Sequence, residues 1–107
     1  MKPIVDEIAR KLRGALTEQM EDFEGLYVFG SQVRGDATEE SDLDIVVLLG
    51  QDYYSWPDEL FNIWSRFSIE YYDIIELDIR PKTKKSLAWN PNFYNEVVNK
   101  GVFYGRT

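Results

Sequence analysis

The sequence of 107 residues contains no cysteine and no histidine. Without cysteine the chain has no disulfide, thiolate zinc site or cysteine nucleophile. Without histidine it has no Ser-His-Asp triad and no imidazole proton shuttle. It also lacks an apolar run of membrane-spanning length and the apolar segment of a signal peptide. The chemistry must therefore come from carboxylates, hydroxyls, lysine and arginine, and we expect a cytoplasmic protein with no membrane partner.

Positive charge is also scarce, because 12 Lys and Arg residues face 19 Asp and Glu residues, a net charge of −7. Electrostatics alone does not draw such a chain to nucleic acid, so nucleic acid is not the expected partner. A length of 107 residues with 44% hydrophobic residues suits one small globular domain over residues 1–107.

Hydrophobic spacing and the Gly and Pro positions predict the order of the elements. They are a helix (Met1–Met20), a strand (Leu26–Phe29), a turn with a short helical piece (Gly30–Gly35), a polar loop (Asp36–Ser41), a strand (Asp42–Leu49), a helix from about Pro57, a strand (Tyr71–Arg80), a short helix from Pro91 and a last strand (Val102–Tyr104). This order predicts an α/β (α+β) fold in which helices pack against a mixed sheet.

The turn from Gly30 to Gly35 is the first candidate site. A glycine after a strand, followed by a serine that can start a helical turn, lets backbone N–H groups converge on an anion. The Ser31 hydroxyl and the Arg34 guanidinium can add to such a phosphate-binding turn. The alternative is an ordinary strand-to-helix turn with a surface arginine.

Two groups of carboxylates form the second candidate site. Asp42 and Asp44 share one face of the predicted strand, where they repel each other unless a cation such as Mg²⁺ neutralises them. Glu76 and Asp78 share a face of the next predicted strand, and either can complete a three-carboxylate cluster able to hold two metal ions. For Asp42 and Asp44 the alternative is a solvated loop before their strand. For Glu76 and Asp78 it is the solvent-exposed face of an edge strand.

Together these residues resemble the minimal nucleotidyltransferase (MNT) family of the DNA polymerase β superfamily. Its signature is Gly-Ser, ten residues, then Asp-x-Asp, and here residues 32–41 separate Gly30-Ser31 from Asp42-Leu43-Asp44. The segments Leu77–Pro81 and Gly101–Tyr104 also resemble later parts of the family pattern. The fuller motif is met by Phe29, Gly30, Ser31, Arg34, Gly35, Ala37, Ser41, Asp42 and Asp44.

The resemblance implies a small nucleotidyltransferase-type fold and transfer of AMP from ATP, or of another nucleoside monophosphate, to a hydroxyl group. It assigns Mg²⁺, as two ions, to Asp42, Asp44 and Asp78, with Asp78 preferred over Glu76 and helping to deprotonate the acceptor. It assigns the triphosphate to the Gly30–Gly35 turn, through Gly30, Ser31, Arg34 and Gly35, and to Ser41.

The resemblance further implies a toxin–antitoxin pair, because small members of the family act as antitoxins that transfer AMP to a tyrosine of a HEPN-type toxin. Tyr53, Tyr54 and Trp56 are expected to form an exposed surface for such a partner or for a homo-oligomer. A contact-only binding module is the alternative function, and transfer to a small molecule or an RNA end is a third. The basic cluster Arg80, Lys82, Lys84 and Lys85 can meet a triphosphate, an RNA or an acidic partner, but a solvated loop is the simpler interpretation.

Overall fold

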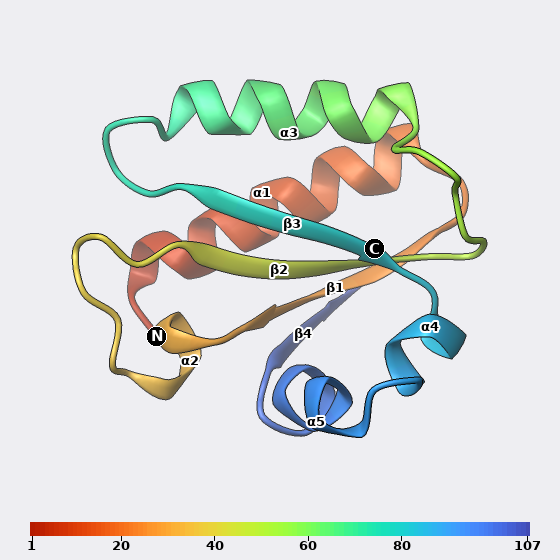
Figure 1. Cartoon of the computed structure of the whole chain (residues 1–107). Coiled ribbons are helices and arrows are strands. Elements are labelled where there is room, and N and C mark those ends of the chain that lie inside the picture. The colour runs from red at the N-terminus through yellow and green to blue at the C-terminus, as the bar shows by residue number, and fades with distance from the viewer.

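The computed structural model describes all residues from Met1 to Thr107. Four strands form one mixed sheet in the order β3-β2-β1-β4, with β1 antiparallel to β2 and β4, and β2 parallel to β3 (Figure 1). The elements are α1 (Pro3–Gln19), β1 (Phe23–Phe29), α2 (Ser31–Arg34), β2 (Leu43–Leu49), α3 (Asp58–Glu70), β3 (Leu77–Lys82), α4 (Lys84–Ala88), α5 (Pro91–Tyr94), the π-helix η1 (Asn95–Asn99) and β4 (Val102–Gly105). The predicted mixed sheet packed with helices is thus confirmed.

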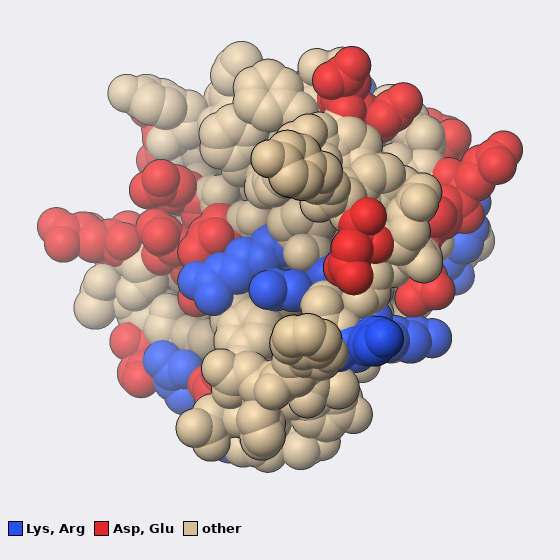
Figure 2. Space-filling view, turned by 45° about the vertical axis from the view of Figure 1, so that its right-hand side comes forward, with Lys and Arg blue, Asp and Glu red and all other residues tan.

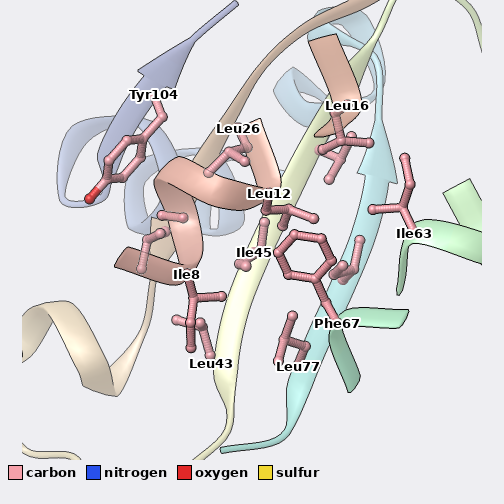
Figure 3. Close-up of a cluster of buried hydrophobic side chains, with 14 of the residues drawn as sticks. Ile8, Leu12, Leu16, Leu26, Leu43, Ile45, Ile63, Phe67, Leu77 and Tyr104 are labelled. Atoms are coloured by element: carbon pink, nitrogen blue, oxygen red, sulfur yellow. The ribbon is translucent and has the colours of Figure 1, made fainter. Parts of the chain in front are cut away.

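The larger core lies between the sheet and the two long helices, α1 and α3 (Figures 1 and 3). Its α1 residues recur at helical spacing, because one stripe of the helix faces the sheet. Leu43, Ile45 and Val47 of β2 point to this side, as alternate residues of a strand do. The buried stripe of α1 consists of Val5, Ile8, Ala9, Leu12 and Leu16.

The opposite face of the sheet carries a smaller apolar cluster under the short elements α4, α5 and η1 (Figure 1). Val46 and Leu48, the intervening residues of β2, point to this side and meet Phe29, Leu87 and Val97. The same alternation places Asp44 and Asp78 on this less covered face. The two faces of one strand therefore supply the larger core and the candidate site.

Three expected boundaries are wrong. The third strand begins at Leu77 rather than Tyr71, because Tyr71 ends α3 with its N–H bonded to the Phe67 carbonyl and its ring against Phe67. The first strand begins at Phe23, passing an irregularity at Gly25. Asp42 lies just before β2 instead of inside it.

The basic cluster was expected to be a loop, and half of it is helical. Lys84 and Lys85 open α4, whose N-terminus is closed by a capping box between Thr83 and Ser86. Thr83 Oγ1 accepts from the Ser86 N–H at 3.0 Å, and Ser86 Oγ accepts from the Thr83 N–H at 2.9 Å.

None of the helices is long and apolar enough to span a bilayer.

Candidate active site

The Gly30 turn lies directly against Asp44. Gly30 has φ 80° and ψ −151°, a conformation that glycine adopts at little cost. A Cβ atom built on Gly30 would lie 2.5 Å from Oδ2 of Asp44, so a side chain at this position would displace the carboxylate. Gly35 ends α2 in the left-handed conformation, with φ 88°. The glycines therefore shape the turn, and Gly30 brings its backbone next to an acidic side chain.

Three adjacent strands place the candidate residues in one row. Asp44 of β2 pairs with Phe29 of β1 on one side and with Asp78 of β3 on the other. Both aspartates lie on the face that carries the smaller cluster. Glu76, the competing candidate, precedes β3, and its backbone carbonyl accepts the Leu43 N–H at 2.8 Å. Of the two candidates on this segment, Asp78 is the one in register with Asp44.

The surroundings of Asp44 oppose its ionisation. Burial raises the pKa of Asp44, and Asp78 raises it further through its charge and a hydrogen bond between the two carboxyl groups. Arg80 acts in the opposite direction, while Asp42 adds a weak repulsion. Asp44 takes part in no salt bridge. A bound cation would relieve this unfavourable arrangement of negative charge.

The structure joins the predicted metal ligands as a pair rather than a triad. No three acidic side chains gather closely enough to hold a metal ion between them. Asp44 and Asp78 are together, and Asp42 lies half-buried just before β2. Their donors are all carboxylate oxygens, the type that Mg²⁺ prefers. The repelling pair beside the Gly30 backbone therefore fits a hard divalent cation.

Gln32 is a site residue that the sequence interpretation missed. Its side chain is 4% exposed, and Nε2 donates to the carbonyl oxygens of Ser41 and Asp42, at 3.4 Å each. It thereby ties α2 to the loop that delivers Asp42 and Asp44. Its position inside the Gly-Ser turn, next to Ser31, was the one available signal, and nothing in the sequence marks it as buried.

Two other predicted site residues already have partners within the protein. Nη1 of Arg34 donates to Oε1 of Glu96 in η1 at 2.7 Å, and Nε lies 3.4 Å from Oδ2 of Asp36. This pairing raises the pKa of Arg34 and lowers the pKa of Glu96. Ser41 Oγ accepts the Thr38 N–H at 2.9 Å, which makes Ser41 part of a loop turn.

The expected aromatic surface is formed only in part. Tyr54 is fully exposed, but Tyr53 donates its hydroxyl to Asp22 and Trp56 packs edge-on against Trp64. These three residues line a cleft of about 370 Å³ beside the end of β3. The cleft contains none of the predicted metal ligands.

Comparison with protein families places these features in context. A family profile described as a nucleotidyltransferase domain matches residues 9–104. Two candidate protein adenylyltransferases of Methanocaldococcus jannaschii, MJ0141 and MJ1379, are each 32% identical to the chain and cover 92% of it. The aligned regions span 93% and 87% of those proteins.

Solved structures share the fold. A complex of the Shewanella oneidensis HEPN toxin, carrying three AMP groups, with its MNT antitoxin matches with a TM-score of 0.60 and 16% identity. The match covers 94% of this chain and 72% of that one. A toxin–antitoxin structure with AMP-PNP matches with a TM-score of 0.64 and 19% identity, covering 91% and 73%. At these identities the likeness concerns the fold.

Proposed function

Because the chain belongs to the nucleotidyltransferase domain family, we propose that it transfers AMP from ATP to a hydroxyl group of a protein partner in the cytosol. The observation that carries this proposal is the pairing of Asp44 with Asp78 in adjacent strands, directly beside the Gly30 backbone. Such an arrangement combines a cation site with a phosphate-binding turn, the two requirements of phosphoryl chemistry. We further propose that residues 1–107 act as one catalytic domain.

In this proposal Asp42, Asp44 and Asp78 hold Mg²⁺, which supplies charge neutralisation for the triphosphate. The Ser31 and Gln32 amides at the start of α2 have no acceptor within the helix and can donate to phosphate oxygens, joined by the Ser31 hydroxyl. The Val33 and Arg34 amides already donate to the Gly30 carbonyl. Arg34, Gly35 and Ser41 complete the turn and its loop. Gln32 positions Asp42 by holding its backbone carbonyl.

The reaction itself is a displacement at the α-phosphorus atom. The acceptor hydroxyl oxygen forms a bond to that phosphorus, the bond to the bridging oxygen of the β-phosphate breaks, and pyrophosphate leaves. The hydroxyl proton passes to a carboxylate oxygen of Asp78. The side chains of this chain thus orient the triphosphate and accept one proton, and no histidine is needed.

A HEPN-type protein is the proposed acceptor, and we propose that the chain is the antitoxin of such a pair. Support comes from the fold shared with an MNT antitoxin bound to an AMP-carrying HEPN toxin. Further support comes from four large hydrophobic side chains that are exposed on α3 and in the turns after it, as a partner surface requires. They are Phe61, Ile69, Tyr72 and Ile74.

A contact-only antitoxin is the second candidate function. It is favoured by two observations: the acidic side chains do not form a closed triad, and Arg80 is paired with Asp78. Under that function the chain neutralises its partner without transferring AMP.

Labelled ATP separates the two functions. The protein is incubated with ATP labelled at the α-phosphate, Mg²⁺ and its proposed HEPN-type partner, sought as the product of the neighbouring gene. The label is then located by mass spectrometry. We expect AMP on a partner hydroxyl with the native protein and with Glu18→Gln, an exposed control in α1. Asp44→Asn should give no label. Equal labelling by Asp44→Asn would contradict the proposed role of Asp44 as a metal ligand. If the native protein neutralises the toxin but leaves no label on it, the contact-only function is favoured.

A further inference from the structure

Arg80 lies on the sheet face that carries the two carboxylates. It follows Asp78 by two residues in β3, so both side chains point to the same side of the sheet. Nη2 of Arg80 lies 3.3 Å from Oδ2 of Asp78. Figure 2 shows the side of the molecule where β3 leads into α4, with Lys and Arg side chains in a band and carboxylates directly beside it.

Two aromatic rings hold the guanidinium over the sheet. Its central carbon lies 5.9 Å from the ring centre of Phe29 and 5.6 Å from that of Phe93. These two rings pack edge to face, with centres 5.5 Å apart. Because Phe29 directly precedes Gly30 and pairs with Asp44, the rings that hold Arg80 also border the candidate nucleotide site.

The pairing of Arg80 with Asp78 is easily exchanged. The two side chains are 47% and 36% exposed, and ion pairs with that exposure contribute little to stability. Arg80 also acts on Asp44, because its charge opposes the rise in the pKa of that carboxyl. Without a metal ion, Arg80 is therefore the positive charge that compensates the carboxylate pair.

Arg34, unlike Arg80, is not paired with a proposed metal ligand. Its partner at 2.7 Å is Glu96, which is not among the proposed metal ligands. A divalent cation on the aspartates would compete with Arg80 for Asp78, whereas the Arg34–Glu96 pair contains no proposed metal ligand.

We propose that Arg80 is a phosphate-binding residue of the nucleotide site. In the free protein Arg80 pairs with Asp78, and when a divalent cation takes its place at Asp78, Arg80 moves to the triphosphate. This inference rests on the proposed nucleotidyltransferase function and adds a residue outside the Gly-Ser and Asp-x-Asp motif. The planar guanidinium suits phosphate oxygens, which it can bind with two parallel hydrogen bonds.

Two binding measurements on Arg80→Gln test the proposal, because they should change in opposite directions. Titration with Mn²⁺ alone, followed by the paramagnetic signal of the free ion, should show binding about threefold tighter than in the native protein, since a competing charge is gone. Titration with a non-hydrolysable ATP analogue at saturating Mg²⁺ should show binding about tenfold weaker. Damage to the fold would weaken both.

Two variants serve as controls. Arg66→Gln removes a matched positive charge on α3, on the other side of the sheet, where Arg66 lies over Phe67 without an acidic partner. Both affinities should stay within about twofold of the native values. Arg80→Lys keeps the charge and loses the planar fork, so Mn²⁺ binding should be native and analogue binding about threefold weaker.

The outcomes distinguish the inference from the function on which it rests. If the native protein binds the analogue and Arg80→Gln binds it equally well, the role of Arg80 is refuted and the proposed function stands. If Arg80→Gln weakens both ligands, Arg80 is structural and the inference is again refuted. If the native protein binds no analogue at all, the proposed function fails and the inference fails with it.

Discussion

The two faces of the sheet differ in what they bury. The face under α1 and α3 joins 20 buried residues into one apolar core (Figure 3). The face under α4, α5 and η1 buries a cluster of only five and also carries Asp44, Asp78 and Arg80. The first face stabilises the fold. The second gives up apolar burial for two carboxylates that repel each other and an arginine paired with one of them, as the proposed site for ions and phosphates requires.

Neighbouring residues of β2 offer the largest test of this comparison. Ile45 is fully buried on the core face, and Ile45→Ala should lower the free energy of unfolding by about 3 kcal/mol through the lost burial and the cavity left behind. Asp44→Asn should leave stability at least at the native level while weakening Mg²⁺-dependent nucleotide binding at least about tenfold. Denaturant unfolding and calorimetric titration check the two effects. If Asp44→Asn lowered the free energy of unfolding, the claim that only the core face of β2 stabilises the fold would be contradicted.

Two glycines should respond to the same substitution with opposite signs. Gly30→Ala should destabilise the protein by about 2 kcal/mol, because it forces a side chain into a positive φ and against the Asp44 carboxylate. Gly14→Ala, in an exposed turn of α1 with nothing within 4 Å, should stabilise it by roughly 0.5 to 1 kcal/mol.

Thermal unfolding measures both variants, and nucleotide binding should be lost only in Gly30→Ala. If Gly30→Ala bound nucleotide normally, the close approach of the turn to Asp44 would have no functional role.

Gln32 links the two parts of the site and should give a smaller effect. Gln32→Ala removes two hydrogen bonds to the loop before β2, at a cost of about 1 kcal/mol. We expect Mg²⁺ affinity to fall several-fold because Asp42 is held less firmly. The matched control is Gln19→Ala at the exposed end of α1, which should change neither quantity.

The pH dependence of stability should show the smallest effect. Because burial and Asp78 raise the pKa of Asp44 in the folded protein, ionisation of Asp44 opposes folding. Its penalty is absent below the ordinary pKa of 3.8, grows as pH rises through the higher folded pKa, and is then constant. The difference in unfolding free energy between Asp44→Asn and the native protein should follow that course. A difference independent of pH would contradict the raised pKa.

Much of this architecture follows from local patterns. The helical stripe of α1, the alternation along β2 and the spacing of Gly30-Ser31 from Asp42-Leu43-Asp44 are all properties of short segments. They were enough to predict the family, the mixed sheet and the nearness of Asp44 to the turn.

The remaining features depend on contacts between distant segments. The pairing of Arg34 with Glu96 joins residues 62 positions apart, and no local pattern indicates it. The position of Asp78 opposite Asp44 is set by the register of β2 and β3, which period-two spacing leaves open between Glu76 and Asp78. Tyrosine has a high propensity for strands, but Tyr71 packs on Phe67 and lies at the end of helix α3.

A double-mutant cycle on Asp44 and Asp78 tests the central claim most directly. Calorimetric titration measures the affinity of a non-hydrolysable ATP analogue at fixed Mg²⁺ for the native protein, Asp44→Asn, Asp78→Asn and the double variant. If the two carboxylates share a cation, each single variant should bind the analogue at least about tenfold more weakly than the native protein. The double variant should then bind only slightly more weakly than the single variant with the lower affinity. Losses that add in full, or single variants that bind like the native protein, would contradict a shared ion.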